Sequence, residues 1–68
     1  MNKRQTDQWR SEIEQRRNRR RLYDLTLLTV AQRVGVSETT VWRWERGGKK
    51  PTQELIRKWD NALFKEAK

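Results

Sequence analysis

The chain has 68 residues, of which 17 are lysine or arginine and 9 are aspartate or glutamate, so its formal net charge is +8. This length allows one small domain with a marginal core, and the four tryptophans suit the helix packing that such a core needs. The absence of cysteine and histidine excludes disulfides, thiol chemistry and zinc sites of the usual kind, so we expect no cofactor and no metal.

The excess positive charge lies at both ends of the sequence. Residues 1–24 carry eight basic and four acidic side chains, residues 48–68 carry six and three, and residues 25–47 carry three and two. A basic balance in a small domain favours a polyanionic partner. No apolar run approaches the ~20 residues of a membrane span, and no secretory signal is visible. We therefore expect a cytoplasmic protein, located in the compartment that holds nucleic acid.

The first helix is expected to begin at a cap formed by Thr6 or Asp7 and to run to about Tyr23. Trp9 and Ile13 are four residues apart and give this helix a short apolar stripe. The stripe then stops, because basic residues follow. Arginine is a good helix former, so the helix itself is expected to continue.

Five arginines lie between positions 16 and 21. The run has three interpretations. It is a solvated helix face, or a face that contacts DNA phosphates through Arg16 and Arg17, or an arginine-rich RNA-binding segment that folds on its target. The residues alone leave all three open.

A second helix is predicted over residues 27–34, with Thr26 as its N-cap. Gly35 should end it, because glycine enters the left-handed conformation without a Cβ penalty. Arg33 lies away from the apolar face and is either a phosphate contact or solvated. The apolar face consists of residues at helical spacing: Val30, Ala31 and Val34.

Ser37 is expected to cap a third helix over residues 38–46. Val41 and Trp44 are three residues apart and face inward together. Two short helices that cross steeply at a glycine-containing turn form a helix-turn-helix. The outward side of the third helix then carries Glu38, Thr39, Trp42, Arg43 and Arg46.

The C-terminal part is predicted to be a basic loop followed by one more helix. In the loop, Lys49 and Lys50 are either phosphate contacts or plainly solvated. Thr52 can cap the helix. The apolar pattern of that helix is amphipathic and comprises Leu55, Ile56, Trp59, Ala62 and Leu63.

Residues 25–63, LTLLTVAQRVGVSETTVWRWERGGKKPTQELIRKWDNAL, resemble the lambda-repressor-like (Cro/repressor, XRE-type) helix-turn-helix family. The chain departs from the family at Leu27, where a glutamine that bonds a DNA phosphate often stands, and in its less apolar first helix. The matching features are Ala31 at the helix contact, Gly35 in the turn, Val41 and Trp44 facing inward, the WERG sequence of residues 44–47, and Pro51-Thr52 at the next helix.

The resemblance implies an all-α fold: a compact four-helix helix-turn-helix domain, with any fifth helix absent or reduced to a tail. Residues 1–24 would form a basic segment and helix 1, and residues 25–68 the helix-turn-helix core and C-terminal helix, as one domain overall. The resemblance also implies that Arg20 pairs with Glu45 as a structural element.

The function implied by the resemblance is sequence-specific binding of double-stranded DNA by a small phage or bacterial transcriptional repressor, with residues 38–46 in the major groove. Arg43 can fork onto guanine. Trp42 either contacts DNA or covers the stem of the first helix. Base-contact candidates are Glu38, Thr39, Trp42 and Arg43. DNA backbone candidates are Ser37, Arg33, Arg46, Lys49, Lys50, Arg16 and Arg17.

The expected partner is a double-stranded DNA operator, which family members usually bind as two-fold dimers on palindromes. An enzyme is not expected, because catalysis would rest on carboxylates and none forms a recognisable acid–base pair. Two alternatives remain: an RNA-binding protein that uses residues 16–21, and an antirepressor-type protein-interaction module.

Overall fold

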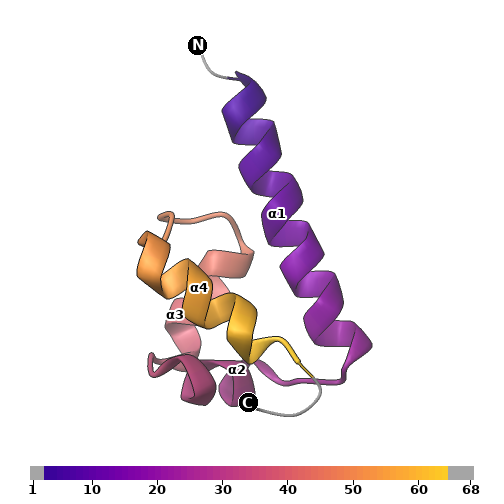
Figure 1. Cartoon of the computed structure of the whole chain (residues 1–68), viewed down its shortest axis with the longest axis vertical. Coiled ribbons are helices and arrows are strands. Elements are labelled where there is room, and N and C mark those ends of the chain that lie inside the picture. The colour runs from indigo at the N-terminus through magenta and orange to yellow at the C-terminus, as the bar shows by residue number, and fades with distance from the viewer. Residues whose placement is uncertain (1–2, 65–68) are drawn as a thin grey trace.

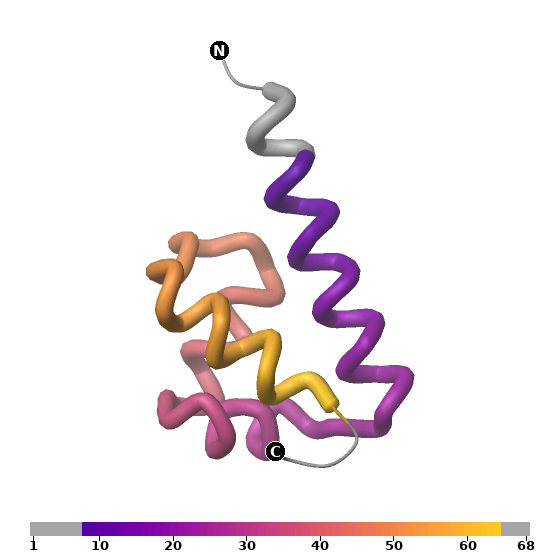
Figure 2. Tube along the Cα trace, viewed as in Figure 1, coloured from indigo at the N-terminus to yellow at the C-terminus, as the bar shows by residue number. Residues whose placement is uncertain are grey.

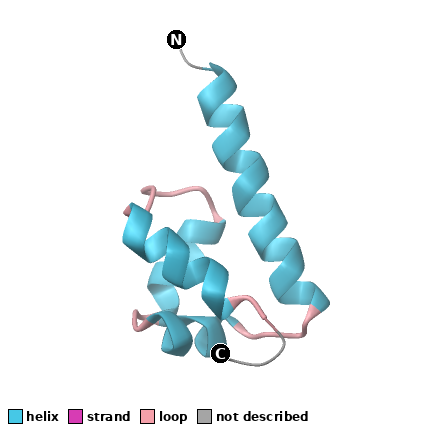
Figure 3. Ribbon diagram, in the orientation of Figure 1, coloured by secondary structure: helices cyan, strands magenta, loops and turns pink. Residues whose placement is uncertain are grey.

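The computed structural model describes residues 3–64, with side chains described from Gln8 onward. The described residues form four helices and no strand (Figures 1 and 3). The predicted all-α, four-helix architecture is confirmed. The helices are α1 (Lys3–Leu22), α2 (Leu27–Val34), α3 (Glu38–Glu45) and α4 (Gln53–Ala62).

Helix α1 is the longest element and lies along one side of the other three, with its first half rising beyond them (Figure 1). It begins at Lys3, so the expected cap at Thr6 or Asp7 is wrong. The preceding polar residues continue the helix instead, because they lack a strong breaker and are fair helix formers. Ile13 is buried and Trp9 half-buried, so the short apolar stripe faces inward as predicted.

Helices α2 and α3 form the helix-turn-helix, and their ends match the capping chemistry of the sequence. The Thr26 hydroxyl accepts from Thr29 N at 3.0 Å, and the Ser37 hydroxyl accepts from Thr40 N at 3.2 Å. Gly35 adopts φ 92°, a left-handed conformation that suits glycine. These predicted caps are confirmed, and they set the two helices at a sharp corner.

The core lies where α2, α3 and α4 meet, against the face of α1 (Figure 2). Val30, Val41 and Trp59 are fully buried. The rings of Trp44 and Trp59 pack at a centroid distance of 5.1 Å with planes tilted by 43°, a favourable aromatic arrangement. Ile56, expected in the core, is only half-buried. The interior thus fixes α3 from behind through Val41 and Trp44.

Candidate nucleic-acid interface

One face of α3 is turned away from the protein. Val41 and Trp44 are buried on its inner side, with exposed fractions of 0% and 6%. Because side chains three and four apart share a helix face, the other side of α3 must face outward. The exposed residues there are the predicted base-contact candidates: Glu38, Thr39, Trp42 and Arg43.

The Arg43 guanidinium has no hydrogen-bond or ion-pair partner among the residues whose side chains are described, 8–64. Its carbonyl oxygen, by contrast, accepts from Gly48 N at 3.0 Å, which folds the following loop back onto the end of α3. A Cβ at Gly48 would lie 3.2 Å from that oxygen. The backbone at Arg43 is therefore fixed, while its planar fork of donors remains available for a ligand.

Trp42 is 46% exposed and lies beside α2 rather than over the stem of α1. The Arg46 guanidinium sits over its ring, 4.6 Å from the centroid, in a cation–π contact. Trp42, Leu27, Glu38 and Thr39 line an open hollow of about 340 Å³ on this face. The outer face of α3 therefore combines an apolar wall, a carboxylate and a positively charged edge.

Ser37 and Thr40 form a small hydroxyl pair at the start of α3. The oxygen atoms Ser37 Oγ and Thr40 Oγ1 are 2.8 Å apart, and the Ser37 hydroxyl also caps the helix. Ser37 is exposed, but its hydroxyl already accepts from the Thr40 N–H as the N-cap of α3. Any phosphate contact at this position would share that hydroxyl or use the free N–H groups of the first helical turn.

Arg16, a predicted DNA backbone contact, is held inside the protein instead. Its Nε donates to Asp60 Oδ1 at 2.7 Å and its Nη2 to Asp60 Oδ2 at 3.2 Å. The guanidinium also lies over the Trp59 ring, 5.2 Å from the centroid. This bidentate pair engages the Arg16 guanidinium, so the predicted phosphate contact would have to compete with Asp60. Arg16 ties α1 to α4.

Arg33 is not plainly solvated, because its guanidinium has acceptors in the fold. Its Nη1 donates to the carbonyl oxygens of Ala62 at 3.0 Å and Phe64 at 2.8 Å. The last carbonyls of a helix lack intrahelical partners and carry the negative end of the helix dipole. Arg33 Nη1 therefore caps the C-terminal end of α4, and a phosphate contact of Arg33 stays a prediction that would use its other nitrogen atoms.

Arg20 and Glu45 lie together, as the family resemblance implied. Arg20 Nε donates to Glu45 Oε2 at 2.6 Å and Arg20 Nη2 to Glu45 Oε1 at 3.1 Å. Arg20 Nη1 also donates to the carbonyl oxygen of Leu25 at 3.0 Å. This pair joins α1 to the end of α3 and to the connection before α2.

The remaining basic candidates differ in their surroundings. Lys49 and Arg46 are exposed. Lys50 is also exposed, but its Nζ lies 4.9 Å from the centroid of the Trp9 ring. Arg17 is half-buried on α1. None of the four forms an ion pair with a described side chain, so all four stay predicted phosphate contacts, and the three exposed ones are the more accessible.

Two structural partners were missed by reasoning from the sequence. Asp60 lies 44 residues from Arg16 in the chain, and no spacing pattern relates the two. The acceptors of Arg33 are backbone carbonyls, which no side-chain motif marks. A general signal did exist for Asp60: it is an acidic residue on the amphipathic last helix, beside a buried tryptophan.

The domain is all-α, with four helices, and its helix-turn-helix consists of α2 and α3, with one face of α3 exposed. These features define a helix-turn-helix protein of the DNA-binding regulatory class. The sequence model of the helix-turn-helix family matches residues 16–67. The chain therefore belongs to this family, in its Cro and repressor (XRE) type. No curated protein and no solved structure gives a significant match.

No helix in the described part of the chain is both long and apolar enough to cross a membrane. Among the side chains that the structure describes, from Gln8 to Phe64, no group of three or more acidic, cysteine or histidine residues could hold a metal ion.

Proposed function

We propose that this protein is a small transcriptional regulator that binds a specific double-stranded DNA operator through the outer face of α3. The observation that carries the proposal is the exposed, unpartnered Arg43 on a helix whose inner face is fixed by Val41 and Trp44. A helix fixed from behind can enter the major groove with its reading side chains in a defined orientation.

Each exposed side chain of α3 matches a feature of the major groove. The Arg43 fork fits the two acceptors of guanine, and the Glu38 carboxylate fits the amino group of cytosine. The apolar wall that Trp42 and Leu27 form beside Glu38 and Thr39 suits a thymine methyl group. These assignments give an operator half-site in which a guanine is the most strongly specified base.

Backbone contacts would come from groups that flank α3. Ser37 lies at its start and Arg46 at its end, and Lys49 and Lys50 follow in the loop. Such contacts fix the register of the protein on the duplex without reading bases. Two copies on a palindromic site, with half-sites about one helical turn apart, would follow the usual arrangement of helix-turn-helix dimers, and occupancy of a promoter would repress transcription.

The arrangement of α1 favours duplex DNA over the RNA alternative. That alternative relied on five arginines between positions 16 and 21, but Arg16 and Arg20 are engaged with Asp60 and Glu45. The test is selection of bound sequences from a random duplex library, with hairpin RNA as competitor. A palindromic consensus that survives competition supports the proposal. Equal retention of hairpin RNA would overturn it.

The base-reading role of Arg43 gives a specific prediction. Arg43→Ala should weaken binding to the selected site by about 1–3 kcal/mol and relax the preference at one base pair, because a bidentate contact to guanine is lost. The measurement is the dissociation constant on the selected site and on all its single-base variants.

Arg19→Ala is the matched control for Arg43→Ala, since Arg19 is an exposed arginine on α1. It should leave the base preferences unchanged. If Arg43→Ala weakens every single-base variant equally, Arg43 contacts a phosphate. Base reading would then fall to Glu38, Thr39 and Trp42.

Salt dependence should report the phosphate contacts. The logarithm of the affinity should fall with the logarithm of salt concentration by roughly 0.9 for each phosphate neutralised. Lys49→Ala should lower this slope by about one contact and weaken binding similarly on every sequence. Fluorescence anisotropy at several salt concentrations measures the slope. An affinity that hardly changes with salt would refute the phosphate assignment.

A further inference from the structure

Three arginines on the C-terminal half of α1, Arg16, Arg17 and Arg20, differ in whether a carboxylate binds them. Arg16 has the Asp60 carboxylate and Arg20 has the Glu45 carboxylate, each through two hydrogen bonds. Arg17 lies between them in the sequence, is half-buried, and has no acceptor among the described side chains, residues 8–64. Its Nε is fully shielded from solvent. The Arg17 guanidinium therefore keeps hydrogen-bonding capacity that an anion in contact with it would satisfy.

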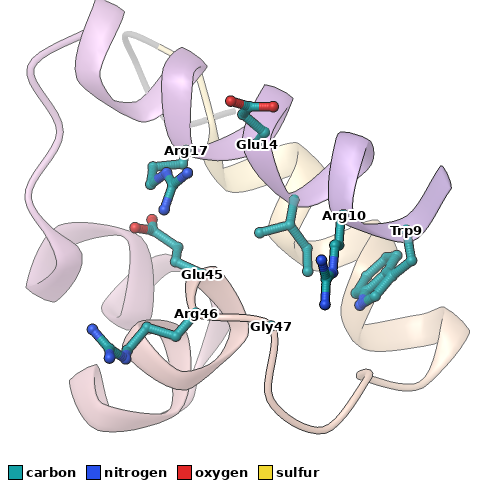
Figure 4. A pocket seen from close by; sticks show the side chains of 8 residues that line it. Trp9, Arg10, Glu14, Arg17, Glu45, Arg46 and Gly47 are labelled. Carbon is teal, nitrogen blue, oxygen red and sulfur yellow. The ribbon is translucent and has the colours of Figure 1, made fainter. Parts of the chain in front are cut away.

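Arg17 lines an open pocket of about 590 Å³ between α1 and the end of α3 (Figure 4). This volume is in the range of small-molecule sites. One wall comes from α1 and the other from the last residues of α3 and the loop behind it. The lining residues are Trp9, Arg10, Ile13, Glu14, Arg17, Glu45, Arg46 and Gly47.

The charges at this pocket are predominantly positive. Glu45 lines it, but its carboxylate is already bound by Arg20 at both oxygens. Figure 4 shows the Glu14 carboxylate directed away from the pocket, whereas the Arg10 and Arg17 guanidinium groups lie on its α1 side. Lys50 adds a further positive charge beside Trp9. Arg10 and Arg17 thus offer two guanidinium groups with no carboxylate assigned to either.

The apolar part of the pocket consists of Ile13 and Trp9, which lie on the same face of α1. A guanidinium fork binds a phosphate or carboxylate in bidentate fashion, and an apolar wall accommodates the organic body that carries such a group. The family match begins at Arg16, so Trp9, Arg10 and Ile13 lie on a part of α1 that the family model does not include.

We propose that the pocket between α1 and the end of α3 binds an oxyanion of the phosphate class, with Arg17 as its ligand and Arg10, about two helical turns earlier on α1, as a further positive charge beside it. Arg17 supplies the sheltered charge and Arg10 the exposed one. Because Arg46 and Gly47 also line the pocket, the bound group lies directly behind the C-terminal end of the recognition helix. The phosphate belongs either to a small organic molecule or to the DNA backbone.

The experiment measures binding of inorganic phosphate, a nucleoside monophosphate and the corresponding neutral nucleoside to the full chain by calorimetry, without DNA. Sodium chloride at equal ionic strength is the salt control. We expect the two phosphates to bind and the nucleoside not to bind. Arg17→Gln should weaken phosphate binding by about tenfold or more, since a charged hydrogen-bond partner is lost. Arg19→Gln, the same change at an exposed position of α1, should have no effect.

Arg10→Gln provides a second variant that does not disturb the interior, because Arg10 is exposed, and it should weaken binding less than Arg17→Gln. Circular dichroism in chloride verifies that each variant is folded. If phosphate binds no more tightly than chloride, the proposed site does not exist. The same conclusion follows if Arg19→Gln lowers the phosphate affinity as much as Arg17→Gln does. Displacement of bound phosphate by a duplex identifies the DNA backbone as the source, and simultaneous binding of both identifies a small molecule.

Discussion

Trp44→Ala should unfold the protein or leave it close to unfolding at room temperature. The Trp44 side chain is buried beneath the helix-turn-helix and packs on the Trp59 ring at 5.1 Å. Replacing a buried tryptophan by alanine costs about 3–5 kcal/mol, because apolar area and packing contacts are lost and a cavity remains. A chain of 68 residues has a total stability of roughly 3–10 kcal/mol at ordinary per-residue values. The measurement is chemical denaturation followed by circular dichroism.

Trp42→Ala is the matched control for this experiment, since it removes the same side chain from the opposite face of α3, two residues away. Trp42 is exposed, and its contact with Arg46 lies at the surface. Its loss should change the stability by less than about 1 kcal/mol. A Trp44→Ala variant that melts like the parent would contradict the packing of α3 described above.

The ion pair between Arg20 and Glu45 should show the second largest effect. Its side chains have exposed fractions of 16% and 7%, so the pair is largely desolvated. Glu45→Ala should cost about 3–5 kcal/mol, because the Arg20 guanidinium is left without its carboxylate. Arg20→Ala should be comparably harmful. The double variant should be more stable than the sum of the two single effects predicts, since no unpaired charge then remains.

A double-mutant cycle with thermal and chemical denaturation gives the coupling energy of this pair. The control is Lys58→Ala, because Lys58 and Glu54 form an exposed i,i+4 pair at 3.7 Å. Such pairs contribute at most about 0.5 kcal/mol. If the changes in unfolding free energy of Arg20→Ala and Glu45→Ala simply add in the double variant, the ion pair does not couple α1 to α3.

The local features of the helix-turn-helix could be predicted from the sequence. Thr26, Ser37 and Thr52 cap their helices as expected, and Gly35 ends α2 in the left-handed conformation. Each of these features depends on groups within four residues along the chain, where a hydroxyl meets a nearby N–H or a Cβ penalty is avoided. The inward direction of Val41 and Trp44 also follows from helical spacing alone.

The roles of the long basic side chains were decided by the tertiary structure. Arg16, Arg17 and Arg33 had the same interpretation in the sequence, as possible phosphate contacts. In the fold Arg16 binds Asp60 from α4, Arg33 caps the end of α4, and Arg17 is left beside a pocket. An arginine reaches several ångströms beyond its backbone, so its partner depends on which distant elements pack beside it.

The sequence by itself therefore determined the number of helices, their caps and the family to which the chain belongs. It also determined which face of α3 is exposed, because amphipathic spacing is a property of the helix alone. Only the tertiary structure decided which charges remain free for a ligand. Charge pairing needs two groups to be brought together and desolvated, and here the partners lie up to 44 residues apart in the chain.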